Sequence, residues 1–191
     1  SNVGTARFVY DNYKHQQQKF VDGIKRLHLN EPLGIELKGE AKPVVHEPSE
    51  APNGWSGISL PQMAYGYEVT ITPLQMLAFY NAIANNGVMV KPKFVKAIMK
   101  DGQVVEEIPT EVLNPAIASP KTIDQIQTIL EKVVSEGLGK KAGSKHFKVS
   151  GKTGTAQVSQ GKGGYKSGRM QYLVSFCGFF PSEDPKYSCI V

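Results

Sequence analysis

The chain has 191 residues, of which 40% are hydrophobic and 20% charged, and its formal net charge is +5. This is the composition of an ordinary globular domain, and no apolar run reaches the roughly 18 residues that a membrane span needs. The basic residues are scattered rather than gathered into a stripe with aromatic residues between them, which argues against a nucleic-acid-binding surface.

The first third of the chain predicts helices, a strand and a loop. Phe20, Ile24 and Leu27 recur at helical spacing, so residues 2–29 are expected to form a helix in two pieces. Residues 34–38 alternate apolar and charged side chains, which is typical of a short half-exposed strand. Residues 42–61 are rich in Pro, Glu, Ser and Asn and carry Trp55, and this composition predicts a long surface loop.

The clearest helix is predicted to begin after Thr72, an N-cap residue followed by Pro73 and completed by Gln75 as a capping box. Its side chains are apolar nearly all round, which is typical of a buried helix. Gly87 suits the left-handed position at its end. Farther on, Asp101-Gly102 stands between two apolar runs and predicts a β-hairpin.

A second helix is expected after Ser119-Pro120, with one apolar face made by Ile123, Ile126, Leu130, Val133, Val134 and Leu138. Three runs of strand-forming residues follow, at 148–158, 172–180 and 187–191. A loop joins the first two runs and carries the glycines at positions 161, 163, 164 and 168. Helices followed by an antiparallel meander predict the α+β class or an α/β/α sandwich.

Two cysteines, Cys177 and Cys189, lie in the last two of these runs. If residues 181–186 form a hairpin loop, Cys177 is opposite Ile190 and Cys189 is opposite Gly178, which leaves the two sulfurs on opposite faces of the sheet. Buried free thiols are therefore the favoured reading. A disulfide stays open, because a one-residue change in register reverses the conclusion.

The segment Lys152-Thr153-Gly154 is the strongest chemical signal in the chain. The tripeptide by itself is common, but here it lies on a predicted strand that follows a helix and precedes a glycine-rich loop and two more strands. Serine penicillin-recognising enzymes carry a K-T-G motif in such a setting. A P-loop is the competing reading of Gly151-Lys152-Thr153, but it needs a glycine where this chain has His146.

Two further segments resemble the same family, in the same order along the chain. Residues 65–76 read Y-G-Y-E-V-T-I-T-P-L-Q-M, similar to the G-Y-G…T-P-L-Q segment of class B penicillin-binding proteins, with Glu68 in place of the usual second glycine. Ser1-Asn2-Val3-Gly4 is similar to the end of their S-x-N motif, with Asn2 as the asparagine, although Ser1-Asn2 could also be a cloning remnant. The chain thus resembles the division-specific class B penicillin-binding proteins over nearly its whole length.

The resemblance implies a penicillin-binding-protein or serine β-lactamase-like fold, here an incomplete one, with residues 1–145 mainly helical and 146–191 forming sheet strands. It implies a peptidoglycan D,D-transpeptidase that acts without metal or cofactor. Lys152, Thr155 and Asn2 are its candidate catalytic residues, and the Thr155 N–H is the candidate oxyanion donor. Candidate substrate-binding residues are Thr153, Gly154, Thr155 and Tyr67. Packing is the alternative role for the Tyr67 ring.

The nucleophilic serine of this family belongs to an S-x-x-K motif. The serines at positions 49, 119, 135 and 144 lack that spacing, so the nucleophile is expected N-terminal to Ser1, in a chain that looks cut at both ends. An exposed sheet would then make the fragment self-associate. The implied partners are stem peptides ending in D-Ala-D-Ala, β-lactams and divisome proteins, in a membrane-anchored, extracytoplasmic setting of the cell envelope. A serine β-lactamase and a non-catalytic β-lactam sensor remain alternatives.

Overall fold

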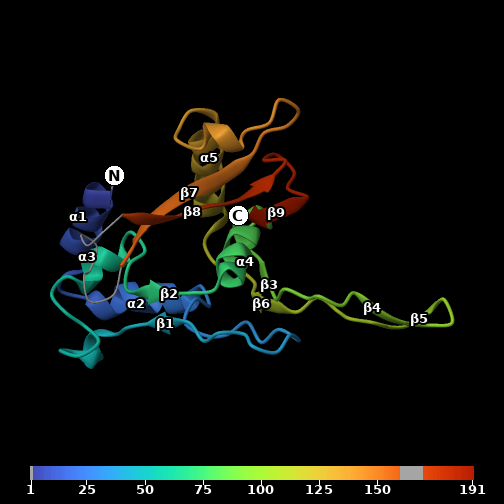
Figure 1. Ribbon diagram of the computed structural model, residues 1–191, viewed down its shortest axis with the longest axis horizontal. Helices are drawn as coiled ribbons and strands as arrows, with labels where there is room; N and C mark the ends of the chain where they lie inside the picture. The colour runs from blue at the N-terminus through green and yellow to red at the C-terminus, as the bar shows by residue number, and fades with distance from the viewer. Residues whose placement is uncertain (1, 160–169) are drawn as a thin grey trace. The chain divides into compact units, whose positions relative to one another are not determined.

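The computed structural model describes residues 2–159 and 170–191. The chain divides into two compact units. Unit 1 comprises Ser1–Met76 and Val90–Asn114, and unit 2 comprises Leu77–Met89 and Pro115–Val191 (Figure 1). Helix α4 (Pro73–Ala84) and strand β3 (Met89–Val90) run across the boundaries between the two units. Helices and antiparallel strands both contribute, which confirms the predicted α+β class.

The core of unit 1 forms beneath three helices, α1 (Asn2–Tyr13), α2 (Gln17–Arg26) and α3 (Ser59–Met63). The first two confirm the predicted helix in two pieces. Helix α1 packs against α3. The buried side chains that form the core are Val9, Val21, Trp55, Leu60 and Met63.

Residues 34–38 form a turn region instead of the expected strand. The Glu40 carboxylate accepts hydrogen bonds from the backbone N–H groups of Leu33 (2.6 Å), Gly34 (2.9 Å) and Ile35 (3.3 Å). Backbone donors satisfied in this way have no need of a strand partner. Gly34 also has φ of +68°, outside the extended region. The prediction was wrong because alternation cannot reveal a carboxylate that folds back on the chain.

The predicted surface loop at 42–61 contains more order than its composition indicates. Strand β1 (Val44–Val45) pairs with β2 (Val69–Thr70), and η1 (Pro48–Glu50) follows. Trp55 is buried, and its Nε1–H donates to Gln17 Oε1 at 2.7 Å. Burying the indole while satisfying its donor ties this segment to the core of unit 1.

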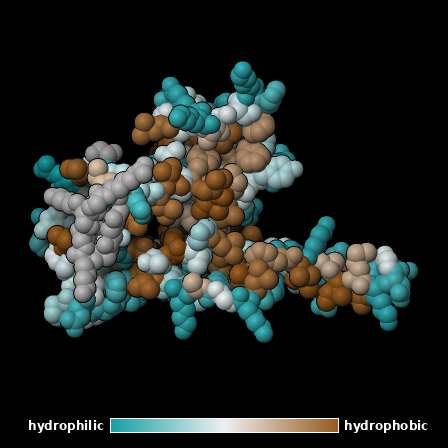
Figure 2. Space-filling view, viewed as in Figure 1, coloured by the Kyte–Doolittle hydropathy of each residue, from teal (hydrophilic) through white to brown (hydrophobic). Residues whose placement is uncertain are grey.

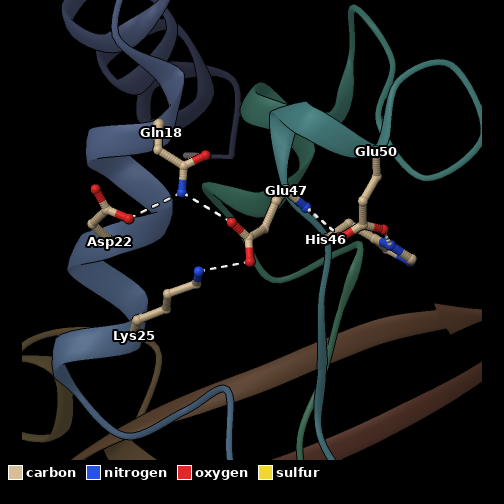
Figure 3. Close-up of polar contacts among 6 residues, drawn as sticks. All are labelled: Gln18, Asp22, Lys25, His46, Glu47 and Glu50. Atoms are coloured by element: carbon tan, nitrogen blue, oxygen red, sulfur yellow. Dashed lines mark hydrogen bonds and ion pairs between the residues drawn. The ribbon is translucent and has the colours of Figure 1, made fainter.

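Polar contacts fasten the same segment to α2 (Figure 3). Glu47 accepts from Lys25 Nζ at 2.6 Å and from Gln18 Nε2 at 3.1 Å. Glu50 Oε1 accepts from the Glu47 backbone N–H, and Glu50 Oε2 lies 2.7 Å from His46 Nδ1. The hydrogen bond with His46 lowers the pKa of the Glu50 carboxyl. The Glu47 contacts therefore hold the start of η1 beside α2, and the Glu50 contacts stabilise the η1 turn itself.

The expected hairpin is present as β4 (Ala97–Lys100) and β5 (Gln103–Glu107). Asp101 and Gly102 have φ of +52° and +78°, the backbone that a tight two-residue hairpin turn requires. The register shifts between Ile98 and Met99. Exposed apolar side chains follow both strands, at Ile98, Met99, Val104 and Val105 (Figure 2). Strand β6 (Val112–Asn114) ends this part of unit 1.

Helix α4 begins as the sequence predicts. The Thr72 backbone N–H donates to Gln75 Oε1 at 2.8 Å, and the Gln75 N–H donates to Thr72 Oγ1 at 3.1 Å. This reciprocal pair is a capping box. Gly87, with φ of +90°, follows the helix in the left-handed region.

Helix α5 (Pro120–Ser135) supplies the other helical layer of unit 2, followed by η2 (Lys140–Ala142). Ser119 Oγ accepts from the Thr122 N–H at 3.2 Å, which confirms the predicted cap. Ile123, Leu130 and Val134 are buried on one face of this helix, as expected. Leu138 is 92% exposed and lies beyond the helix, so its assignment to this apolar face was wrong.

Strands β7 (Ser150–Val158), β8 (Gln171–Phe180) and β9 (Tyr187–Ile190) form an antiparallel sheet in the order β7-β8-β9. Phe179 is fully buried against Ile83 and Leu130, so one face of the sheet packs on helices α4 and α5. The register places Cys177 opposite Ile190 and Gly178 opposite Cys189, and both thiols are free. The predicted register and the free thiols are confirmed, although Cys177 is buried and Cys189 only half-buried. The four glycines of the predicted loop lie outside the described residues.

Candidate functional site

The Lys152-Thr153-Gly154 segment lies in the middle of β7. Within the described residues, β7 has a single neighbouring strand, β8, so its other edge is unpaired. An unpaired strand edge can accept an extended peptide through backbone hydrogen bonds. The position of Lys152 inside a strand also excludes a P-loop, whose lysine belongs to a loop that leads into a helix.

Side chains of β7 alternate between the two faces of the sheet. Thr153 and Thr155 therefore share one face, while Lys152 and Gly154 share the other. Lys152 is exposed, and its Nζ donates to the Thr153 carbonyl oxygen at 2.7 Å. The ammonium group is thus held close to the motif backbone and remains accessible from solvent. The predicted motif residues lie together, with two hydroxyls and one cation on adjoining positions.

Glycines on both strands bring β7 and β8 close together beside the motif. Gly151 is directly opposite Gly178. A side chain at Gly151 would collide with the Phe176 ring and would come within 2.7 Å of the Cys177 carbonyl oxygen. One at Gly178 would collide with the Ser150 carbonyl oxygen and meet the Phe176 ring at 3.0 Å. Sequence reasoning missed this packing, although glycine within a strand is the signal for a close approach.

A second contact of this kind lies at Gly154, which is opposite Ser175. A Cβ atom at position 154 would lie 2.5 Å from Ser175 Oγ and 3.9 Å from Ser175 Cβ. Ser175 is half-buried. Because directly opposed residues project from the same face of a sheet, the Ser175 hydroxyl is on the Lys152 face.

The first residue of β7 is anchored by a partly buried hydrogen bond. Ser150 is 1% exposed, and its Oγ donates to Ser182 Oγ at 2.8 Å. The Ser182 backbone N–H donates to the Lys148 carbonyl oxygen at 3.0 Å. Because Ser150 is buried, breaking this hydrogen bond would leave its hydroxyl unpaired away from water, so the contact resists displacement. The strand therefore enters the motif from a fixed point.

Cys177 is paired with Lys152 across the two strands, so both project from the face on which Phe179 packs against helices α4 and α5. Burial raises the pKa of the Cys177 thiol to about 12. Burial likewise raises the pKa of the Tyr80 hydroxyl, on helix α4, to about 12. A thiol that stays protonated at neutral pH is a poor nucleophile, so Cys177 supports the sheet and does not supply the reacting group.

Tyr67 belongs to unit 1 and packs against Tyr65, with ring centroids 5.6 Å apart and an interplanar angle of 71°. The next residue, Glu68, has φ of +57°. This is the left-handed backbone that the glycine of the related motif would adopt without cost. The departure from the family pattern therefore changes the side chain while the glycine-like backbone is kept.

Asn2 is the first residue of α1 and is exposed. It lines a pocket of about 470 Å³ with Arg7, Tyr10, Pro61 and Tyr65, among others, all in unit 1. The Lys152–Thr155 segment belongs to unit 2. Joint action of Asn2 and Tyr67 with that segment therefore stays a prediction. Ser1 lies outside the described residues.

One serine does have the S-x-x-K spacing, a match that the sequence interpretation overlooked. Ser159 stands three positions before Lys162, and it directly follows β7. Gln160, Gly161 and Lys162 lie outside the described residues. The segment continues as Gly163-Gly164, which is poor helix-forming sequence. The sequence therefore does not predict the helical setting in which a serine and a lysine at this spacing would share one face.

The chain has clear relatives among characterised proteins. The family model described as "Penicillin binding protein transpeptidase domain" matches residues 1–191. Penicillin-binding protein PbpB of Mycolicibacterium smegmatis is 30% identical over 196 residues, which cover 98% of this chain and 28% of that protein. Peptidoglycan D,D-transpeptidase FtsI of Buchnera aphidicola is 26% identical over 192 residues, covering 100% of this chain and 31% of that protein. The chain thus spans less than a third of the length of these relatives.

A solved structure is also similar over the whole chain. The crystal structure of penicillin-binding protein 3 from Mycobacterium tuberculosis, complexed with aztreonam, has a TM-score of 0.80 and 29% sequence identity. The match covers 100% of this chain and 42% of that one. The arrangement of helices and antiparallel strands is therefore shared with a larger protein.

Proposed function

The chain belongs to the transpeptidase domain family of the penicillin-binding proteins, and we propose that the full-length protein is a serine-type peptidoglycan D,D-transpeptidase of cell wall synthesis and division. In this proposal, β7 is the substrate strand of the active site. The observation that carries it is the Lys152-Thr153-Gly154 segment in the middle of a strand with an unpaired edge.

The proposed reaction transfers an acyl group in two steps. A serine outside β7 attacks the carbonyl carbon between the two terminal D-Ala residues of a stem peptide, and the last D-Ala leaves as an amine. The amine of a second stem peptide then attacks the resulting ester, forms the cross-link and releases the serine. β-Lactams acylate the same serine and are retained. Splitting one transfer into two steps is the general advantage of a covalent intermediate.

The β7 residues fit separate tasks in this reaction. The peptide chain adds to the free edge of the strand, and the Thr153 and Thr155 hydroxyls bind its terminal carboxylate. The Lys152 ammonium stabilises negative charge that develops beside the motif. The Thr155 N–H donates to the oxyanion of the tetrahedral intermediate. Asn2 keeps the catalytic role and Tyr67 the substrate-binding role that the resemblance implies.

Acylation of the full-length protein by a fluorescent penicillin tests the proposal. Lys152→Ala is expected to slow acylation about 100- to 1000-fold, as for loss of one group that stabilises the transition state. Lys148→Ala is the matched control, because Lys148 is a surface lysine just before β7 and contacts Glu131 at 3.7 Å. Wild-type acylation by the Lys152→Ala protein would remove Lys152 from the mechanism.

Release of the bound penicillin separates the proposed function from its alternative. A transpeptidase retains the acyl group for many minutes, whereas a β-lactamase hydrolyses it rapidly. We expect slow release.

We further propose that the nucleophile lies outside the 191 residues, so that this chain alone forms no penicillin adduct. Intact-mass spectrometry after incubation with penicillin tests this. Ser159 is the candidate nucleophile within the chain, because it has the S-x-x-K spacing. A stoichiometric mass gain that disappears in Ser159→Ala would overturn the assignment.

The setting is proposed from the same resemblance. We place the protein in the cell envelope, with the domain on the extracytoplasmic side, a membrane anchor in another segment, and divisome proteins as partners. None of the helices formed by residues 2–159 and 170–191 is both long and apolar enough to cross a bilayer. Membrane fractionation of cells that express the full-length protein tests the anchor, and a protein found only in the soluble fraction would contradict it.

The isolated chain is expected to self-associate through its sheet. Tyr172 and Val174 of β8 share one face of the strand and are 53% and 69% exposed, while Leu173 on the other face is 66% exposed. Exposed apolar side chains on a sheet promote association. Light scattering with a thermal melt tests the expectation. A monodisperse monomer that melts cooperatively above about 65 °C, the top of the usual mesophile range, would contradict it.

A further inference from the structure

Gly154 leaves a gap on the Lys152 face of the sheet, and the protein itself fills that gap. Ser175 Oγ lies 2.5 Å from where a Cβ at position 154 would stand. Among the described residues, leaving aside the chain neighbours of Gly154, no atoms other than those of Ser175 lie within 4 Å of that point. The Ser175 hydroxyl therefore takes the space of the absent side chain.

Gly151 provides the contrast within the same strand. A side chain there would collide with the Phe176 ring and approach the Cys177 backbone carbonyl oxygen to 2.7 Å. The backbone contact would remain whatever side chain stood on β8. At Gly154 the constraint comes from a single hydroxyl, and the Ser175 Cβ is already at 3.9 Å, an ordinary van der Waals distance. Removing one oxygen atom would make room for a methyl group at 154 but not at 151.

The contact between Ser175 and Gly154 lies beside a proposed catalytic group. Gly154 directly precedes Thr155, whose N–H is the proposed oxyanion donor. Displacement of the Gly154 backbone turns that N–H away from its target, and a misplacement of about 1 Å can cost about 100-fold in rate. Ser175 stands against Gly154 from the neighbouring strand, on the face that carries Lys152.

We propose that Ser175 is a positioning residue of the transpeptidase site, whose hydroxyl packs in place of a side chain on Gly154 and thereby fixes the Gly154–Thr155 peptide. The inference rests on the proposed function. It assigns the requirement for glycine at position 154 to a contact inside the protein instead of to the approach of the substrate.

A double-mutant cycle in the full-length protein tests the proposal, with the rate constant of acylation by a fluorescent penicillin as the readout. Gly154→Ala is expected to lower the rate about 100-fold, and Ser175→Ala about tenfold. The double variant should match Ser175→Ala, instead of showing the product of about 1000-fold expected for independent sites. Ser175→Thr keeps the hydroxyl and should remain within about threefold of wild type.

Thermal midpoints of the same proteins form a second cycle that does not depend on activity. Gly154→Ala should lower the midpoint, and adding Ser175→Ala should restore it. Gly151→Ala is the matched control, and Ser175→Ala should not rescue it. A double variant as slow as Gly154→Ala, midpoints that add independently, or wild-type acylation by Ser175→Ala would each overturn the positioning role. Absence of acylation in the wild type would instead contradict the proposed function, and the thermal cycle would still decide the Ser175–Gly154 contact.

Discussion

The β4–β5 hairpin and the β7–β8 pair are both antiparallel, yet their registers are held in different ways. In the hairpin, the turn residues Asp101 and Gly102 adopt positive φ, and the apolar side chains of both strands are exposed. In β7–β8, one face is buried on helices, and Phe176 and Ser175 occupy the space where side chains on Gly151 and Gly154 would stand. A turn thus suffices to pair two strands, while β7, which carries the proposed site residues, is also held by packing along its length.

The largest difference should appear on truncating one side chain in each pair. Phe179→Ala is expected to lower the free energy of unfolding by about 3–5 kcal/mol, because it empties a fully buried site. Val105→Ala in β5 should change it by less than about 0.5 kcal/mol, since Val105 is 64% exposed. Chemical denaturation measures both. Equal losses of unfolding free energy would show that Val105 is buried against another part of the protein.

Glycine substitutions distinguish a packing constraint from a backbone constraint. Gly151→Ala should cost about 1–3 kcal/mol by overpacking, and Gly151→Asn at least as much. Gly102 has φ of +78° with open space around it, so Gly102→Ala should cost about 1–2 kcal/mol while Gly102→Asn largely avoids that loss, because Asn tolerates the left-handed region. Rescue by Asn at both positions would refute the packing account of β7.

The buried face of β8 also sets an alkaline limit on stability. The folded chain holds the pKa of Cys177 and of Tyr80 near 12, whereas the unfolded thiol titrates near 8.5. As pH rises above about 9, the unfolded state loses protons that the folded state keeps, so stability falls with pH. Cys177→Ala should flatten this fall, and Cys189→Ala serves as the control. If the wild type, Cys177→Ala and Cys189→Ala lost stability equally as pH rises, Cys177 would not be the source of the alkaline fall.

A smaller effect is expected at Glu68, one of the non-glycine residues that have positive φ. Glu68→Gly should raise the free energy of unfolding by about 0.5–1 kcal/mol, because glycine adopts φ of +57° without steric cost. Asp101→Gly in the hairpin should gain less, since Asp visits this region more readily. Thermal unfolding of the two variants decides whether the strain differs.

Sequence reasoning succeeded where the determinants are local. The capping box at Thr72 and Gln75, the Asp101-Gly102 turn, the Ser119 cap and the register of Cys177 against Ile190 all follow from residues close together in the chain. The strand expected at 34–38 failed because a carboxylate six residues from Gly34 satisfies its backbone. Trp55 was placed in a surface loop because its partner, Gln17, is distant in sequence.

The sequence predicts the motif of the candidate site but not the contacts that hold its residues in place. The position of Lys152, Thr153, Gly154 and Thr155 on a strand was predicted. The contacts made by Phe176 and Ser175 depend on the pairing of β7 with β8, which no spacing along the chain reveals. The roles of these residues, and of Asn2 and Tyr67 in the other unit, stay predictions that the acylation experiments decide.

The exposed tip of the β4–β5 hairpin is a suitable site for attaching a label. Apart from the chain neighbours of Gly102, no atom of the described residues lies within 4 Å of where a Cβ would stand, and exposed hairpin tips tolerate insertions well. An epitope or a small fluorophore placed between Asp101 and Gly102 would leave the strand that carries Lys152 untouched in sequence. Such a label would allow the protein to be followed in living cells while its acylation remains open to measurement.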